Sequence, residues 1–315
     1  MAVRTGSRAD VDAAVERALL RGSRGMDVRG LIFQGALLLA MLVSLAVLVT
    51  LIGDALTDGA PVFAERGADF ITSNVSSLPE RAGVWQGIRG SVTIVLFVVL
   101  LALPLGLGAA IYMEEYAHDT KVTRAINANI RNLAGVPSIV YGLLGIALFV
   151  QFRALTPLTG GRSVISAGLT MSILVLPIVI ITSAEALRAV PHSIREAAFG
   201  VGATRSEVVR SHVLPYALPG IFTGTILTLA RAFGEAAPLI MIGASTGFLS
   251  EGSGTLVERL QGPYTALPVL VYDFAGRNLR AFQASTAAAV LVLLAVLLFV
   301  NAAAIILRNR YERKW

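Results

Sequence analysis

Long apolar runs alternate with shorter charged or polar stretches along most of the chain. A helix that crosses about 30 Å of hydrocarbon needs about 20 apolar residues, and six runs approach or exceed that length. The first run is longer than the apolar part of a signal peptide and no clean small-x-small cleavage site follows it, so we expect it to be retained. We predict an all-α integral membrane protein with six transmembrane helices at residues 31–52, 88–112, 132–152, 165–187, 219–244 and 282–307.

The polar stretches divide the chain around these spans. We predict a basic N-terminal segment (1–30), the first transmembrane helix with an external linker (31–87), a core with the remaining spans (88–307) and a basic tail (308–315). A longer polar segment at 191–218 interrupts the core between the fourth and fifth spans of the chain.

Composition supports a membrane protein and excludes several kinds of site. Hydrophobic residues make up 55% of the chain and charged residues only 15%, whereas a soluble domain carries about a quarter charged residues. Cysteine is absent, which excludes disulfides, thiolate metal sites and thiol nucleophiles. The three histidines (His118, His192 and His212) are widely separated, so we expect no metal site.

The basic residues indicate how the chain crosses the membrane. Of 26 Lys and Arg, 17 fall in segments that are cytoplasmic if both termini are inside, 8 fall in external segments and Arg231 lies within a span. Basic residues are enriched in cytoplasmic loops, so this bias predicts an N-in, C-in topology. It also argues against nucleic-acid binding, because the charges are scattered between apolar runs rather than gathered on one face.

Proline interrupts the second to fifth spans, at Pro104, Pro137, Pro177 and Pro238. Such breaks are tolerated where neighbouring helices or a water-lined cavity satisfy the freed backbone groups. We therefore expect these spans to line a pore or cavity, with the proline-free first and sixth spans at the periphery. The alternative is that the prolines only shape the packing of the helices.

The polar segment between the fourth and fifth spans has the pattern of two short helices joined by a glycine turn. Residues 196–198 continue a helix, Gly202 breaks it, and Thr204 is placed to cap a second helix. We expect Leu214 and Pro215 to end that helix before the fifth span begins. The alternative is an amphipathic connector that lies on the lipid headgroups.

One charged pair lies inside the fifth span. Arg231 and Glu235 are four residues apart, which would place both on one face of a helix. An arginine near the bilayer centre costs at least about 2.5–3.5 kcal/mol, so it is rarely kept without a polar partner or a purpose. We interpret Arg231 as a contact for a translocating anion, with Glu235 orienting it and accepting the proton of a hydrogen-bearing phosphate. The alternative is an ion pair that only holds the bundle together.

The chain lacks the sequence needed to hydrolyse ATP through a P-loop. A Walker A motif contains Gly-Lys-Ser/Thr, and neither Lys121 nor Lys314 follows a glycine. Any use of ATP must therefore involve separate subunits.

The polar segment resembles the EAA motif of ABC importer permeases, EAA-x3-G-x9-I-x-LP. The matching residues are Glu196, Ala197, Ala198, Gly202, Leu214 and Pro215. In that family the segment is the coupling helix that fits a groove on a separate ATPase, so the resemblance implies this role here. His212 stands where the motif has isoleucine, and we expect it to alter how tightly the second helix packs. The resemblance also implies the MetI-like bundle of type I ABC importer permeases.

Further stretches narrow the resemblance to the permeases of phosphate-specific ABC importers, of the PstA type. They read GLGAAIYMEEYA from Gly106, NLAGVPSIVYGLLGIALF from Asn132 and RAFGEAAPLIMIGA from Arg231. The resemblance implies an inorganic phosphate importer in the bacterial plasma membrane, with Arg231 and Glu235 on its translocation path. The implied partners are a PstC-like permease, two PstB-like ATPases that use ATP and Mg²⁺, and an external PstS-like phosphate-binding protein. No cofactor is implied for this chain.

Other residues in the resembling stretches have open roles. The hydroxyls of Ser138 and Tyr141 are candidates to line the path, with core packing as the alternative for each. Glu114 and Glu115 also match the family, but for them we expect only a structural role, as caps of a turn or as partners of Arg124.

The closest rival is a permease for another oxyanion, such as sulfate, molybdate or phosphonate, because Arg231 would serve any anion. An intramembrane enzyme would need a nucleophile–base pair or a metal cluster, which the spans do not offer, so we expect no catalytic residue. A secondary transporter that works without ATP would not need the polar segment, and a bulky residue at Gly202 would leave its transport unchanged.

Overall fold

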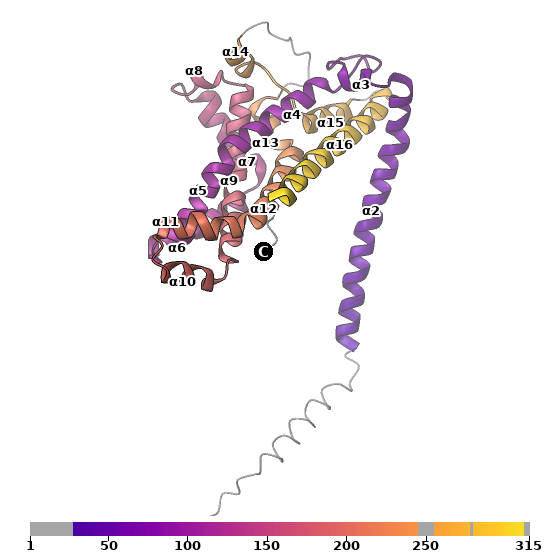
Figure 1. Cartoon of the computed structure of the whole chain (residues 1–315). Helices are drawn as coiled ribbons and strands as arrows, with labels where there is room; N and C mark the ends of the chain where they lie inside the picture. Colours follow the sequence, from indigo (N-terminus) through magenta and orange to yellow (C-terminus); the bar gives the residue numbers. More distant parts are fainter. Residues whose placement is uncertain (1–27, 245–254, 278–279, 312–315) are drawn as a thin grey trace, which may run out of the picture. The chain divides into compact units, whose positions relative to one another are not determined.

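The computed structural model is helical in every regular element that it describes (Figure 1). The described residues are 28–244, 255–277 and 280–311. Most of the predicted N-terminal basic segment and the end of the predicted tail, 308–315, lie outside them.

The chain forms two compact units, Met1–Asp54 and Ala55–Trp315. In the first, the described residues form the N-terminal part of α2 (Val28–Arg66) and are exposed along nearly their whole length. This helix is longer at both ends than the predicted span 31–52. The first part of the predicted external linker therefore continues the helix as far as Arg66, with Pro61 inside it.

The second unit is a bundle of α-helices with inserted π-helical segments. After α2, its elements are α3 (Asp69–Thr72), α4 (Trp85–Phe97), η1 (Val98–Ala102), α5 (Leu103–Ile111), η2 (Tyr112–Tyr116), α6 (Lys121–Ala134), α7 (Ser138–Gly145), η3 (Ile146–Gln151), α8 (Thr156–Thr159), α9 (Val164–Arg188), α10 (His192–Gly200), α11 (Arg205–Val208), η4 (Val209–Val213), α12 (Leu214–Gly234), α13 (Ala237–Ile242), α14 (Leu256–Leu260), α15 (Leu267–Gly276) and α16 (Arg280–Tyr311). The π segments are continuous with their neighbours, so α4 to η2 form one long helix and α11 to α12 another.

The predicted pattern of spans is confirmed with two corrections, at the third and fifth spans. Among the described residues, five helices are long and apolar enough to cross a membrane: α2, the α4–η2 helix, α9, the α11–α12 helix and α16. The predicted third span, 132–152, is wrong as a single helix, because the chain bends by 100° between α6 and the α7–η3 helix. Counted together, that bent pair is the sixth span.

Proline explains where two of the spans break. It has no N–H, and its ring clashes with the carbonyl four residues earlier, so a helix tends to end ahead of it. Pro137 lies in the bend between α6 and α7. Pro238 lies in the first turn of α13, four residues after Gly234, where α12 ends. The predicted span 219–244 is therefore two helices rather than one.

Pro215 does not end a helix, and our prediction that it does is wrong. The chain is helical without interruption from Arg205 to Gly234. The π-helical turn η4 lies directly before Leu214 and Pro215, and such a turn accommodates the missing backbone hydrogen bond. The predicted second short helix is therefore the beginning of the fifth span.

Helix α9 is the centre of the bundle. In its apolar stretch 61% of the residues are buried, against 6% in α16, which is peripheral within this chain as predicted. Glycines allow close approach: a Cβ at Gly168 would lie 2.5 Å from Phe97 Cγ of α4, and a Cβ at Gly224 of α12 would lie 2.5 Å from Thr182 Cβ. Close packing of this kind, rather than hydrophobic burial, drives helix association in lipid.

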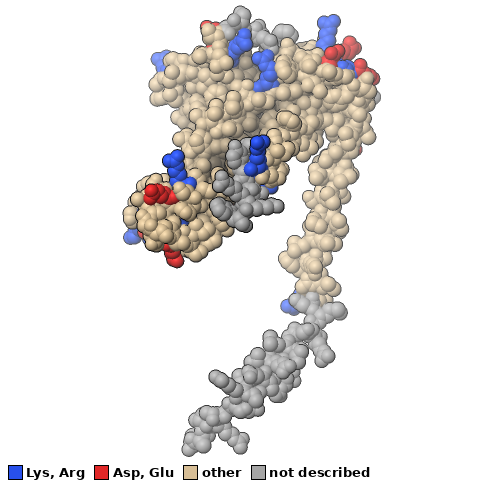
Figure 2. Space-filling view, viewed as in Figure 1, with Lys and Arg blue, Asp and Glu red and all other residues tan. Residues whose placement is uncertain are grey.

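The charged side chains lie mainly at the two ends of the bundle, and the band between them is almost uncharged on the face shown in Figure 2. We call the end that carries α10 the α10 end. Arg308, close to the end of α16, donates from Nη1 to Thr223 Oγ1 in the first half of α12 at 3.2 Å. The C-terminal part of α16 therefore lies towards the α10 end, as the predicted topology requires.

Candidate functional site

The first half of the polar segment is α10, a short helix with one exposed and one buried face. Glu196 and Ala197 are exposed, and the Phe199 ring is about half exposed. Ala198 is buried in an apolar cluster that also contains Leu187 of α9. The small residue lets α10 lie close to the bundle, while its neighbours face outwards, where another protein could bind.

The turn after α10 has the geometry that its sequence predicts. Gly202 has a φ of +87°, in the left-handed region that favours glycine. Thr204 and Glu207 then form a capping box: the Glu207 N–H donates to Thr204 Oγ1 (3.4 Å) and the Thr204 N–H donates to Glu207 Oε2 (2.8 Å). The predicted glycine turn and cap are confirmed, whereas their role in coupling stays a prediction.

The residues at the end of the motif lie on the continuous helix that leads into the fifth span. Leu214 packs partly against the same apolar cluster as Ala198, and Pro215 is exposed. His212 is also exposed, on η4. Its effect on how tightly this helix packs stays a prediction.

The Arg231–Glu235 pair lies at a helix end rather than on a continuous helix face, which corrects our prediction. α12 ends at Gly234, and Glu235 has an extended backbone, with ψ of 112°. The two side chains still meet: Arg231 Nε lies 3.5 Å from Glu235 Oε1. The Arg231 side chain is 53% exposed and that of Glu235 is 20% exposed. Among the described residues, this long contact is the ion pair that Arg231 makes, and about half of its side chain is exposed.

The start of α7 lies at a similar depth to this break. α7 and α12 both run antiparallel to α9, so they run parallel to each other. Gly142 of α7 lies against α13, since a Cβ there would lie 2.9 Å from Pro238 Cα. Ser138 lies seven residues before Gly145, where an added Cβ would contact Thr170 of α9. Arg231 lies seven residues after Gly224, where an added Cβ would contact Thr182. Counted back along the antiparallel α9, both positions are opposite residues 175–177. Ser138, which is partly buried, therefore belongs to the same layer of the bundle as Arg231.

Tyr141 has a structural role that sequence spacing did not show. Its hydroxyl donates to the Leu133 carbonyl at 2.9 Å. Leu133 is four residues before Pro137, which has no N–H to donate, so this carbonyl accepts instead from the Val136 N–H at 3.1 Å and from Tyr141. The Tyr141 ring is buried in the main apolar cluster. Tyr141 thus holds the bend between α6 and α7, and of the two candidate hydroxyls only that of Ser138 lies near the break without such a role.

α13 is held in place by a second buried tyrosine. Tyr264, in the connection before α15, donates its hydroxyl to the Leu239 carbonyl of α13 at 3.0 Å. Burial raises the pKa of the Tyr264 phenol, so the hydroxyl keeps its proton and remains a donor. Together with the close contact at Gly142, this bond fixes the short helix that follows the Arg231–Glu235 break.

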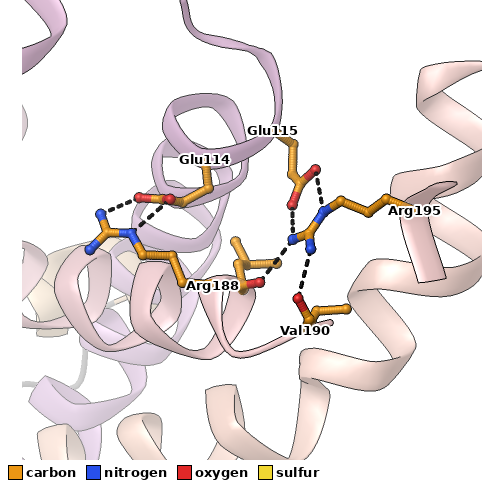
Figure 3. Close-up of polar contacts among 6 residues, drawn as sticks. Glu114, Glu115, Arg188, Val190 and Arg195 are labelled. Atoms are coloured by element: carbon orange, nitrogen blue, oxygen red, sulfur yellow. Dashed lines mark hydrogen bonds and ion pairs between the residues drawn. The ribbon is translucent and has the colours of Figure 1, made fainter. Parts of the chain in front are cut away.

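Four charged residues at the α10 end meet in a way that our sequence analysis missed. Glu114 and Glu115, consecutive in η2, pair with Arg188 at the end of α9 and with Arg195 of α10 (Figure 3). The expected partner, Arg124, pairs with another residue. The true partners lie 74 and 80 residues away along the chain, and the adjacent carboxylates were the only signal in the sequence.

The other end of the bundle carries a polar hollow of about 720 Å³. It is lined mainly by polar side chains between residues 65 and 81, including Asp69, Asn74 and Arg81. Within the described residues, no three His, Asp or Glu side chains lie together in a way that could hold a metal ion.

Comparison with known proteins matches residues 102–314 to the family described as binding-protein-dependent transport system inner membrane component. The chain is 33% identical over 250 residues to "Probable ABC transporter permease protein YqgH" of Bacillus subtilis (strain 168), covering 75% of this chain and 79% of that protein. It is 31% identical over 247 residues to the phosphate transport system permease protein PstA of Xylella fastidiosa (strain 9a5c), covering 78% and 82%. Its similarity to YqgI of Bacillus subtilis, at 35% identity, spans 58% of that protein.

Two solved structures share the fold. One is a bacterial alginate ABC transporter, with a TM-score of 0.60 at 15% identity over 88% of this chain and 95% of the other. The second is the inward-facing MetNI methionine ABC transporter, with a TM-score of 0.54 at 19% identity over 73% and 95%. The chain therefore belongs to the family of binding-protein-dependent transport system inner membrane components, and it has the helical bundle of type I ABC importer permeases.

Proposed function

We propose that this chain is the transmembrane permease subunit of an ATP-driven inorganic phosphate importer and forms half of its translocation path. The observation that carries the proposal is the open Arg231 guanidinium at the end of α12, in the layer of the bundle where α7 also begins. The similarity to phosphate transport permeases, which covers most of the chain, supports phosphate as the cargo.

The chemistry of the break suits a hydrogen-bearing oxyanion. A guanidinium presents parallel N–H donors that match two oxygens of phosphate, which an ammonium does not. Glu235, in contact with Arg231, orients it and competes with the anion for it, so that the ion can leave. Its carboxylate can accept a hydrogen bond from the O–H group that phosphate carries at neutral pH. Ser138, on the neighbouring helix, is a candidate donor at the same depth.

ATP reaches this chain through partners. We assign Glu196, Ala197, Ala198, Gly202, Leu214 and Pro215 to coupling with a separate ATPase that binds ATP and Mg²⁺. The exposed face of α10 and the rigid turn at Gly202 support this assignment. The complete complex would contain a second permease of the PstC type and two PstB-type ATPases. A PstS-type binding protein would dock at the opposite end, where the polar hollow lies.

The proposal is tested with the purified complex in liposomes. We expect phosphate together with its binding protein to stimulate ATP hydrolysis and uptake, and sulfate to do neither. Stimulation by sulfate alone would overturn phosphate as the cargo while leaving the permease assignment intact.

A permease for another oxyanion is the second candidate, because Arg231 can bind the oxygens of any such ion. A substitution of Glu235 distinguishes a phosphate permease from a sulfate permease. Fully ionised sulfate brings no proton for a carboxylate to accept, so a sulfate carrier should tolerate Glu235→Gln, whereas phosphate uptake should fall.

A further inference from the structure

Two adjacent carboxylates of η2 connect the second span to two different elements at the α10 end (Figure 3). Consecutive residues of a helix point in different directions, so Glu114 faces the end of α9 and Glu115 faces α10. Glu114 accepts from Arg188 Nε at 2.8 Å and also from Nη2. Glu115 accepts from Arg195 Nη2 at 2.6 Å.

The two pairs differ in how deeply they lie. The side chains of Arg195 and Glu115 are 16% and 8% exposed, whereas Arg188 is 44% exposed and Glu114 15%. Exposed ion pairs contribute little because water and salt screen them, while a pair removed from water is strongly held if its other hydrogen bonds are made. The Glu115–Arg195 pair is therefore the stronger connection.

Arg195 makes those other hydrogen bonds with the end of α9. Its Nη1 donates to the Val190 carbonyl at 2.8 Å, and its Nη2 donates to the Leu187 carbonyl at 3.0 Å. One guanidinium thus ties together α10, the C-terminal carbonyls of α9 and the end of the second span. A lysine has its three donors on a single nitrogen, so it would lack the rigid fork that spreads the donors of Arg195 over two nitrogens to reach these separate acceptors.

The apolar cluster at the α10 end, which contains Ala198, does not fix the relative positions of the helices as closely as these hydrogen bonds do. Ala110 of α5, Leu187 of α9 and Ala198 of α10 are all buried members of this cluster. Apolar burial resists separation but has little directional preference, so it permits small sliding of one helix on another. The charged hydrogen bonds are directional and oppose that sliding.

We propose that Glu115 and Arg195 are positioning residues that make α10 and the second span move as one body when a partner displaces α10. This inference rests on the proposed ATP-driven function, because only then is α10 displaced by nucleotide. Glu115 acts through Arg195 and touches neither the cargo nor ATP.

The test uses Glu115→Gln, with Glu114→Gln as the matched control, in the reconstituted complex. We expect Glu115→Gln to lower the phosphate transported per ATP hydrolysed by about tenfold, within the usual range of coupling between sites. ATP hydrolysis itself should continue, and the control should stay near the wild-type ratio. A wild-type ratio in Glu115→Gln would overturn the proposal.

A second readout does not depend on the cargo. The chain has no cysteine, so spin labels can be placed through Leu105→Cys on α5 and Ser193→Cys on α10, both at exposed positions. We expect the distance between the labels to stay constant on nucleotide binding in the wild type and to change in Glu115→Gln. If the labels behave in this way but the wild type does not transport phosphate, the cargo assignment fails and the positioning role stands.

Arg195→Lys serves if Glu115→Gln does not assemble. This variant keeps the positive charge but loses the planar guanidinium with its several donors. We therefore expect less phosphate transported per ATP, and a distance between the two spin labels that changes on nucleotide binding. A wild-type ratio and a constant distance in this variant would overturn the proposal.

Discussion

Two Arg–Glu pairs in this chain have the same chemistry and opposite geometry. At the α10 end, Arg195 meets Glu115 at 2.6 Å, and both side chains are largely buried. At the end of α12, Arg231 meets Glu235 at 3.5 Å, and about half of the arginine is exposed. In the first pair the guanidinium donates to a carboxylate and to two carbonyls of the protein, whereas in the second about half of the arginine side chain is exposed.

The difference follows from the backbone that carries each pair. Arg195 lies on a helix packed against the end of α9, so its donors are surrounded by carbonyls. Arg231 lies where Pro238 ends a helix, and Glu235 is on extended backbone beyond it. A buried ion pair is suited to fixing two helices together, whereas an exposed pair leaves the arginine able to exchange its carboxylate for an anionic ligand. Substitutions should therefore have different effects at the two pairs. At the first they should lower stability and the phosphate transported per ATP, and at the second they should lower uptake itself while the complex still assembles.

The largest effect is expected from Arg231→Gln. The loss of a charged donor to the anion should lower phosphate uptake by about two to three orders of magnitude, as for other preorganised anion contacts. Arg231→Lys should also abolish uptake, because the ammonium lacks the fork. Uptake into liposomes and the yield of assembled complex measure the two properties separately. Normal uptake by Arg231→Gln would show that the pair only stabilises the bundle.

Arg195→Ala should give the next largest effect, on stability. It leaves the Glu115 carboxylate and two carbonyls without their donor, at a cost of about 2–3 kcal/mol, less than for a fully buried pair. The thermal midpoint of the purified complex should fall. Arg188→Ala, at the more exposed pair, is the control and should cost about 1 kcal/mol or less. Equal losses for the two variants would remove the distinction between the pairs.

Gly202→Val should distort the turn between α10 and the helix that begins at Arg205, and so lower phosphate-stimulated ATP hydrolysis and uptake. A side chain at a φ of +87° is strained by about 1–2 kcal/mol. Asparagine tolerates this region better, so Gly202→Asn should retain more phosphate-stimulated ATP hydrolysis. Gly200→Ala, at a helical position with open space, is the control. Unchanged uptake with valine at 202 would favour a transporter that does not use ATP.

The smallest effect is expected from His212→Ile, which restores the residue of the EAA motif. The position is exposed, so the free energy of unfolding should change by less than about 0.5 kcal/mol. A clear gain in affinity of the complex for its ATPase, with unchanged stability, would show that residue 212 acts at the subunit interface.

Local patterns predicted much of this fold. Apolar runs located the spans because lipid requires them, and the glycine turn with its Thr204 cap depends only on neighbouring residues. The bend at Pro137 and the end of α12 were harder to predict from the sequence. A proline in an apolar run can either kink a helix or end it, and the packing around it decides which. At Pro215 the helix continues because the π-helical turn η4 precedes it. The sequence around η4 has no pattern that predicts such a turn.

The site was predicted less completely than the fold. Arg231 and Glu235 were found because charges are rare within spans, and their contact is present although the expected helix between them is not. The partners of Glu114 and Glu115 were not found, since Arg188 and Arg195 come close only through the packing of α9 against the second span. Tyr141 likewise gains its structural role from the proline break, which spacing along the sequence does not reveal.

The uninterrupted helix from Arg205 to Gly234 has a mechanical consequence. It begins beside the glycine turn and carries Arg231 near its other end, about 40 Å away at 1.5 Å per residue. Such a helix is a lever arm. A tilt of about 5° at the turn would carry the guanidinium through about 3.5 Å, more than the length of a hydrogen bond. In the proposed function, a small rotation of this one helix would therefore be enough to move Arg231 relative to a bound anion.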